Sequence, residues 1–486
     1  MNYSDQLYIL IHSLSANEKR YFTLHAKQFS NDTKSNALKL FDALCKYKAT
    51  QYDEQAFIKQ NKTKTFCKNL AYEKTNLNDL ILKTMRSYHA DKNTDYHHFI
   101  NNIDIKFLIE KGLTDQALKL IHKSYELAKE KKDYYQLLQL ITFKQFFIAK
   151  KLIKVNYQDF SSEFNDIIEK ISERTYWYNM RLRVYELLEQ LNNAEKLLEL
   201  QSIITQIELE HKENKLSSNI KNTALNILQT YYSKIFNYEK LLDVSLEILN
   251  EYELEENVKD YRVSMHLQII TNVLLAILYL ERREEMLIYI DKVKNLKVES
   301  EYDKITQFKI YTQNMLLYKL NTKSFTDIEK FTDEIDKGIK KYQNQLSDLI
   351  LLNFRFNVIL VYFLSKKYDE VQVRIISFYK NVKYNEQSSY TYIMLNCLEI
   401  LVLISAKAYD TADSLVRSWM RSNVDLFREE PVFKIIEKII KHNSNPNFNL
   451  KESIDLLEKV ENHIKWDQLK GLVMDWANYK IEKKIK

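Results

Sequence analysis

The chain has 486 residues, of which 28% are charged, a formal net charge of +6, and only 3 glycines and 2 prolines. So few Gly and Pro favour long helices joined by short polar turns, because these two residues punctuate tight turns and sheets. The glycines, Gly112, Gly338 and Gly471, are isolated, which excludes the clustered-glycine loops that hold nucleotide phosphates on backbone amides.

The cysteines and the apolar segments indicate the compartment. Cys45, Cys67 and Cys397 form no C-x-x-C pair, so we expect neither a disulfide framework nor a zinc site. The N-terminus lacks the basic segment and apolar run of a signal peptide. The two most apolar runs, residues 267–280 and 349–364, are too short or too polar to cross a bilayer. We therefore expect a cytoplasmic protein.

Residues 1–92 predict a helical N-terminal block. Ser15 and Glu18 form a capping box, in which the serine oxygen and the glutamate carboxylate satisfy each other's backbone amides at a helix start. A long helix is expected from about Lys64 to His89. The segments SLSANEKRYF at 13–22, LFDAL at 40–44 and the LAYEK run ending at Tyr88 resemble a family of uncharacterised helical-repeat proteins. That resemblance implies a helical block ahead of tetratricopeptide-like helices and no particular activity.

The N-terminal block is also basic. Residues 1–100 hold 15 Lys and Arg against 10 Asp and Glu, an excess of +5 out of the +6 of the whole chain. Lys19, Arg20, Lys62 and Lys64 are therefore candidate nucleic-acid contacts. The alternative is a solvated lysine-rich face, since no base-reading motif is present.

Residues 93–465 predict a repeat of helix pairs. In SKKYDEVQVRIISFY, residues 365–379, Tyr368 fills a turn, and Val371, Ile375 and Phe378 share one helix face. The position of Val371 recurs with a mean spacing of 42 residues. The matching positions are Ala117, Phe160, Leu197, Leu241, Met286, Ile328, Ala412 and Ser453.

This repeat resembles the tetratricopeptide-like superfamily. Gly112, Ala117 and Ile121 match that family's turn glycine, packing alanine and following large residue. Its turn aromatic is matched by Tyr238, Tyr368 and Tyr409. The resemblance implies a right-handed α-solenoid whose first helices line a groove.

The sequence also departs from that family. The family unit has about 34 residues with a closing proline, whereas here the unit is longer and Lys129 stands at the proline position. Bulky Ile359 and Ile400 occupy the small first-helix position. We therefore expect longer helices, spaced further apart than in the standard repeat.

The groove that the resemblance implies supplies the candidate partner-binding residues. Mapped onto two consecutive first helices, they are Asn353, Phe356, Leu360, Phe363, Met394, Cys397 and Leu401. An apolar groove of this kind takes an amphipathic helix or an extended peptide. The alternative, which we favour because the helices are expected to be longer, is that these side chains belong to the core.

Residues 466–486 predict a C-terminal helix and a basic tail. Its apolar stripe consists of Trp466, Leu469, Val473, Trp476 and Tyr479. A repeat array needs its last face covered, so a capping role is favoured over a membrane-surface helix.

The sequence carries no recognisable catalytic motif. Asp91, Asp95 and His98 fall at helical spacing and could hold a metal, but a polar helix start is the favoured explanation. We therefore expect no cofactor and no enzymatic activity. The sequence predicts an all-α interaction scaffold for a protein or peptide partner, with a nucleic-acid-binding regulator as the alternative.

Overall fold

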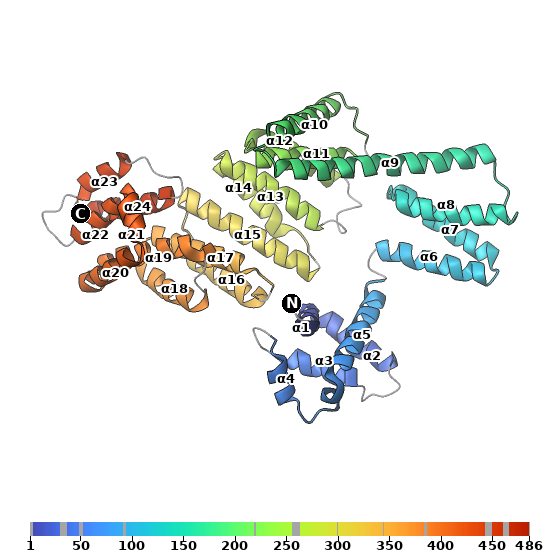
Figure 1. Ribbon diagram of the computed structural model, residues 1–486, viewed down its shortest axis with the longest axis horizontal. Helices are drawn as coiled ribbons and strands as arrows, with labels where there is room; N and C mark the ends of the chain where they lie inside the picture. Colours follow the sequence, from blue (N-terminus) through green and yellow to red (C-terminus); the bar gives the residue numbers. More distant parts are fainter. Residues whose placement is uncertain are drawn as a thin grey trace. The chain divides into compact units, whose positions relative to one another are not determined.

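The computed structural model describes residues 3–29, 36–47, 52–90, 94–217, 220–254, 263–298, 300–343, 345–382, 386–442, 450–459 and 466–485. Within these ranges the secondary structure is helical, without a β-strand, and consecutive helices pack on one another (Figure 1). This confirms the all-α prediction and is consistent with a helical-repeat arrangement. The chain divides into two compact units, Met1–Asn272 and Val273–Lys486.

The first unit begins with the N-terminal block. Its helices are α1 (Tyr3–Ser13), α2 (Ala16–Phe29), α3 (Asn36–Lys46), α4 (Glu54–Gln60), the 3-10 helix η1 (Thr65–Asn69) and α5 (Leu70–Ala90). The long helix expected from Lys64 thus begins as a 3-10 turn. The predicted capping box is confirmed, because the Ser15 amide donates to Glu18 Oε2 at 2.8 Å and the Glu18 amide donates to Ser15 Oγ at 3.3 Å. Phe22, Phe41 and Phe57 anchor the core of the block.

The rest of the first unit continues with helices that pack in chain order. They are α6 (Thr94–Glu110), α7 (Thr114–Glu130), α8 (Tyr134–Ala149), α9 (Tyr157–Leu188), α10 (Ala194–Lys212), α11 (Lys221–Lys234) and α12 (Tyr238–Leu254). The boundary between the units falls within α13 (Val263–Tyr279). Ala117 and Ile121 of α7 pack with Ile105 of α6, as expected for a helix pair.

The second unit has one large hydrophobic core. Its helices are α14 (Arg283–Asn295), α15 (Glu301–Thr322), α16 (Ile328–Tyr342), α17 (Asp348–Leu364), α18 (Tyr368–Asn381), α19 (Glu386–Ser405), α20 (Tyr409–Ser422), α21 (Val424–Glu429), α22 (Pro431–His442), α23 (Leu450–Lys459) and α24 (Asp467–Ile485). Val371, Ile375 and Phe378 of α18 are buried together, which confirms the predicted apolar face.

The positions that define the 42-residue spacing share one place in their helices. Each is the fourth residue of its helix, except Ile328, which is the first residue of α16. Most are buried, whereas Phe160 and Leu197 are half-buried. Phe160 lies in the 32-residue α9, which contacts α8, α10 and α11.

Several helix ends share a turn geometry. Gly112, Lys366 and Lys407 adopt left-handed φ of 71°, 64° and 61°. The amide of the following residue donates to the carbonyl five positions back, as Lys367 does to Tyr362 at 3.1 Å. This is the hydrogen bond of a Schellman motif, which satisfies a carbonyl at the helix end. The same turn occurs at Lys132, Lys151, Asn214, Phe236 and Glu281.

Candidate functional site

The predicted groove residues lie on α17 and α19, and nearly all are buried. Asn353 is half-buried, and Phe356 is 7% exposed. The five others, which we call the covered face, are at most 1% exposed. They are Leu360, Phe363, Met394, Cys397 and Leu401. Burial raises the pKa of the Cys397 thiol, which disfavours its reactive thiolate form.

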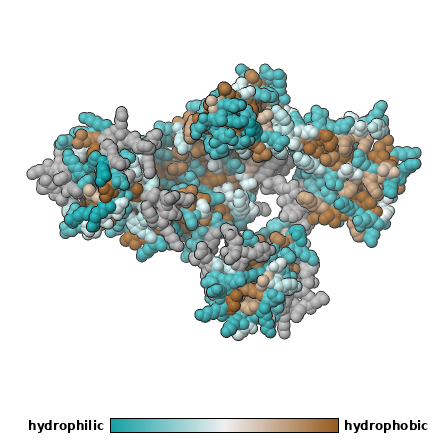
Figure 2. Space-filling model, in the orientation of Figure 1, coloured by the Kyte–Doolittle hydropathy of each residue, from teal (hydrophilic) through white to brown (hydrophobic). Residues whose placement is uncertain are grey.

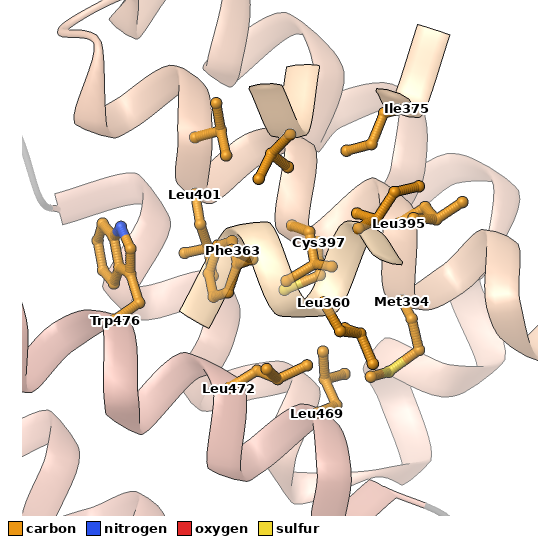
Figure 3. Close-up of a cluster of buried hydrophobic side chains, with 14 of the residues drawn as sticks. Leu360, Phe363, Ile375, Met394, Leu395, Cys397, Leu401, Leu469, Leu472 and Trp476 are labelled. Atoms are coloured by element: carbon orange, nitrogen blue, oxygen red, sulfur yellow. The ribbon is translucent and has the colours of Figure 1, made fainter. Parts of the chain in front are cut away.

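The covered face is buried because the C-terminal helix lies on it. Figure 3 shows Leu469, Leu472 and Trp476 of α24 beside the covered-face side chains of α17 and α19. Trp476 is fully buried, and its indole Nε1 donates a hydrogen bond to Ser405 Oγ, at the end of α19, at 2.9 Å. Four residues of the predicted stripe are buried and Tyr479 is half-buried. The helix packs on α17 and α19 as well as on the adjacent α23.

A carboxylate next to Trp476 is held by two lysines. Asp475 accepts from Lys323 Nζ at 2.6 Å and from Lys366 Nζ at 2.9 Å. Both lysines are left-handed turn residues, Lys323 after α15 and Lys366 after α17. Burial by itself would raise the pKa of Asp475, but the hydrogen bonds from the two lysines outweigh it and hold this pKa below its ordinary value.

Among the residues that the structure describes, a second apolar surface, on α6 and α8, is exposed. Phe99, Ile103 and Phe107 of α6 are 70%, 66% and 53% exposed, and Phe146 of α8 is 41% exposed. We call these four residues the open face. In Figure 2 hydrophobic side chains gather on the surface of the part that holds α6, α7 and α8.

Two residues of the open face share their helix position with buried residues of α17 and α19. Phe107 and Phe146 each stand five residues before a left-handed turn residue, as do Val361 of α17 and Val402 of α19. Val361 and Val402 are only 0% and 3% exposed. These equivalent positions are apolar in both units but differ in exposure.

Polar contacts fix α6 from its other side. The Asn101 side-chain amide donates to Ser124 Oγ of α7 at 3.0 Å. Asn102 and Gln136 of α8 exchange two amide hydrogen bonds at 3.0 and 3.1 Å. Buried amide pairs require one alignment of donors and acceptors, so they set the register of α6 and orient its open face.

Lysines border the open face at the ends of both helices. Lys111 Nζ lies 5.6 Å from the Phe107 ring centroid, and Lys150 Nζ lies 6.0 Å from that of Phe146. Each lysine directly precedes the left-handed residue of its turn. The open face thus combines exposed aromatic rings with ammonium groups at one end.

Sequence reasoning missed the open face, although the sequence of α6 carries a signal. Apolar residues occur on all sides of this helix: Ile105 is buried against α7, whereas Phe99, Ile103 and Phe107 follow one another at intervals of four on a different side. A helix that is apolar all round is expected to be covered all round. The exposure of Phe99, Ile103 and Phe107 in the described structure is therefore the feature that indicates a binding surface.

The other candidate residues are dispersed. Lys19 and Arg20 lie in α2, whereas Lys62 and Lys64 lie in the turn between α4 and η1, so the pairs sit on separate elements. Arg20, Lys62 and Lys64 are exposed.

The candidate metal residues do not form a described site. Asp91 and the side chain of Asp95 lie outside the described residues. His98 is 5% exposed, and its Nε2 is 3.9 Å from Asp133 Oδ2. Among the side chains that the structure describes, no group of three or more His, Cys, Asp or Glu could hold a metal ion.

No protein-family model matches the chain, and the curated proteins and the solved structures give no significant match either. Within the described ranges, no helix is both long enough and apolar enough to cross a membrane.

Proposed function

We propose that this protein is a non-enzymatic interaction scaffold, with residues 93–465 arranged as a right-handed, tetratricopeptide-like α-solenoid. The consecutive helix packing and the recurrent start of the marked helices support this arrangement. In this scaffold the open face of α6 and α8 binds an amphipathic helix of a partner protein.

The observation that carries the proposal is the exposure of the open face. Ile103 is 66% exposed, whereas Leu398, also nine residues before its left-handed turn residue, is fully buried. Exposed apolar side chains that follow one another at intervals of four along one helix are typical of protein-binding sites. An amphipathic helix fits best, because helices bind apolar grooves through anchors at i, i+3, i+4 and i+7.

The lysines at the edge of the open face favour a partner helix of negative charge. Lys111 and Lys150 stand at the ends of α6 and α8, beside the rings of Phe107 and Phe146. A partner helix with carboxylates at the edge of its apolar face would pair with these ammonium groups. We therefore expect acidic rather than basic amphipathic helices to bind.

Affinity capture with the full chain tests the proposal. Ile103→Asp places a carboxylate in the open face, whereas Leu198→Asp makes the same change at a residue of α10 that is 68% exposed. Both variants should keep the wild-type midpoint of denaturant-induced unfolding. Capture of the partner from native extract should fall about tenfold or more for Ile103→Asp, since an apolar anchor contributes about 1.4 kcal/mol or more, and should persist for Leu198→Asp.

Equal capture by the two variants would refute the assignment of the open face. Sedimentation velocity of the purified chain measures self-association. Self-association that is lost in Ile103→Asp but kept in Leu198→Asp would identify the partner as a second copy of the chain.

The basic N-terminal block supports the alternative function, a nucleic-acid-binding regulator, because Arg20, Lys62 and Lys64 are exposed. Nucleic-acid affinity that depends on phosphate contacts falls steeply with salt. Retention of the full chain on a nucleic-acid column at about 0.15 M salt, lost in the triple alanine variant of these residues, would favour this function. Elution at low salt, unchanged by the substitutions, would exclude these contacts.

A further inference from the structure

The second unit contains an apolar helix-binding surface that is already occupied by a segment of the same chain. The covered face receives Leu469, Leu472 and Trp476 of α24 (Figure 3). Lys323 and Lys366 pair with Asp475, and Ser405 accepts from the Trp476 indole. Apolar anchors together with a charged contact and a directed hydrogen bond are the features by which a groove selects a helix.

We infer that α24 is an exchangeable ligand of the covered face, which it shields from an amphipathic helix of a partner that carries an acidic residue beside a tryptophan. The acidic residue pairs with Lys323 and Lys366, and the indole N–H donates to Ser405. Binding of the partner helix requires α24 to leave, so α24 lowers the affinity for the partner.

Gly471 supports the view that α24 is less firmly held than its buried side chains suggest. This glycine lies in the interior of the helix, is exposed, and has no atom within 4 Å of the position that a Cβ would take. Neither a close approach nor a positive φ therefore requires a glycine here. Glycine disfavours a helix interior relative to alanine, so its presence lowers the stability of α24 without improving its packing.

The polar end of the site is accessible to a competing helix. The Lys323 side chain is 63% exposed although it pairs with Asp475, and the Asp475 side chain is 24% exposed. A partner carboxylate can therefore approach Lys323 before α24 has left. Charge complementarity thus favours an acidic helix as the occupant.

The experiment measures binding of a fluorescent synthetic peptide, residues 466–485, to the full chain. In the wild-type chain α24 competes with this peptide, so the apparent affinity is reduced by the fraction of molecules in which the covered face is free. Asp475→Lys places three positive charges together and releases α24, and the wild-type peptide should then bind at least tenfold more tightly. The matched control, Asn478→Ala on the exposed side of α24, should bind like the wild type.

A second variant changes the equilibrium in the opposite direction. Gly471→Ala stabilises the helical α24 and touches no other residue, so the peptide should bind about fivefold more weakly, which corresponds to about 1 kcal/mol. Adding Lys323→Ala and Lys366→Ala to Asp475→Lys should reverse the gain in affinity, because the peptide loses the partners of its own carboxylate.

The same measurements show whether α24 can leave the covered face or is a permanent part of the core. If Asp475→Lys unfolds the chain, Asp475→Asn replaces it, with a smaller gain in affinity expected. Absence of peptide binding in the folded variants, or exchange of the α24 amides only on global unfolding, would overturn the inference and make α24 part of the core. Neither outcome affects capture at the open face, so the scaffold function is judged separately.

Discussion

The open face of α6 and α8 and the covered face of α17 and α19 are two apolar helix surfaces that differ in exposure. Met394 and Phe99 both stand thirteen residues before a left-handed turn residue, yet Met394 is fully buried and Phe99 is 70% exposed. In the second unit α24 supplies the cover. Among the described residues of the first unit, no helix buries the corresponding side chains of α6.

This difference shows that burial of such a face is not fixed by the helix that carries it. The helix pair is held together by its other side, where Ile105 meets α7 and Val371 meets α17. The remaining apolar face is therefore free to take whichever helix is complementary to it. In one unit this is a segment of the chain itself, and in the other we propose a partner.

The largest expected effect is the difference in stability between phenylalanine-to-alanine variants of α17 and of α6. Phe356→Ala and Phe363→Ala each remove a ring that is at most 7% exposed, so each should lower the free energy of unfolding by ~3–5 kcal/mol. Phe99→Ala and Phe107→Ala remove rings that are more than half exposed, so each should change it by less than ~0.5 kcal/mol. Urea denaturation of the four single variants measures the difference.

Partner capture sharpens the same comparison. The Phe99 and Phe107 variants should lose the partner at wild-type stability, whereas the Phe356 and Phe363 variants should lose stability first. If Phe99→Ala destabilised the chain as strongly as Phe363→Ala, the open face would be buried in solution and could not serve as a docking surface.

The second prediction concerns the pH dependence of the α24 contact. The pKa of Asp475 is lowered in the folded chain from its ordinary 3.8. Its contribution to stability is therefore complete above pH 3.8 and is lost as the pH falls through the lower, folded pKa. The charged groups that face it are Lys323 and Lys366, from the turns after α15 and α17.

Asp475→Asn isolates this contribution. At neutral pH the substitution should cost about 1–2 kcal/mol, since it weakens hydrogen bonds to a charged group that is partly exposed. The difference in denaturation midpoint between wild type and Asp475→Asn should shrink as the pH is lowered from 6 to 3. A constant difference would mean that the ion pairs add nothing to the docking of α24.

The sequence predicted the local features of the fold well. The capping box at Ser15, the helix starts marked by Val371 and Ala412, and the buried stripe of α24 all depend on neighbours within one or two turns. Such patterns are determined by helical periodicity and by capping.

The sequence did not predict which helix packs on which apolar face. Asp475 contacts Lys323 across 152 residues of chain, and no local pattern specifies that contact. For the same reason the groove residues of α17 and α19 could be named, but not distinguished as groove or core. The exposure of Phe99 and Ile103 likewise depends on the absence of a neighbour, which periodicity does not report.

The smallest expected effect is a change in stability on exchanging glycine and a side chain in the turns after α6 and α19. Gly112 and Lys407 hold the same left-handed conformation after α6 and α19, with φ of 71° and 61°. A side chain in this region crowds the following carbonyl, at a cost of about 1 kcal/mol, and glycine avoids that cost. Lys407→Gly should therefore stabilise the second unit by up to ~1 kcal/mol. Gly112→Ala should destabilise the first unit by a similar amount through the backbone alone, because a Cβ there meets no atom within 4 Å. Thermal unfolding of both variants measures the two shifts, and shifts of the same sign would show that the two turns do not share one conformation in solution.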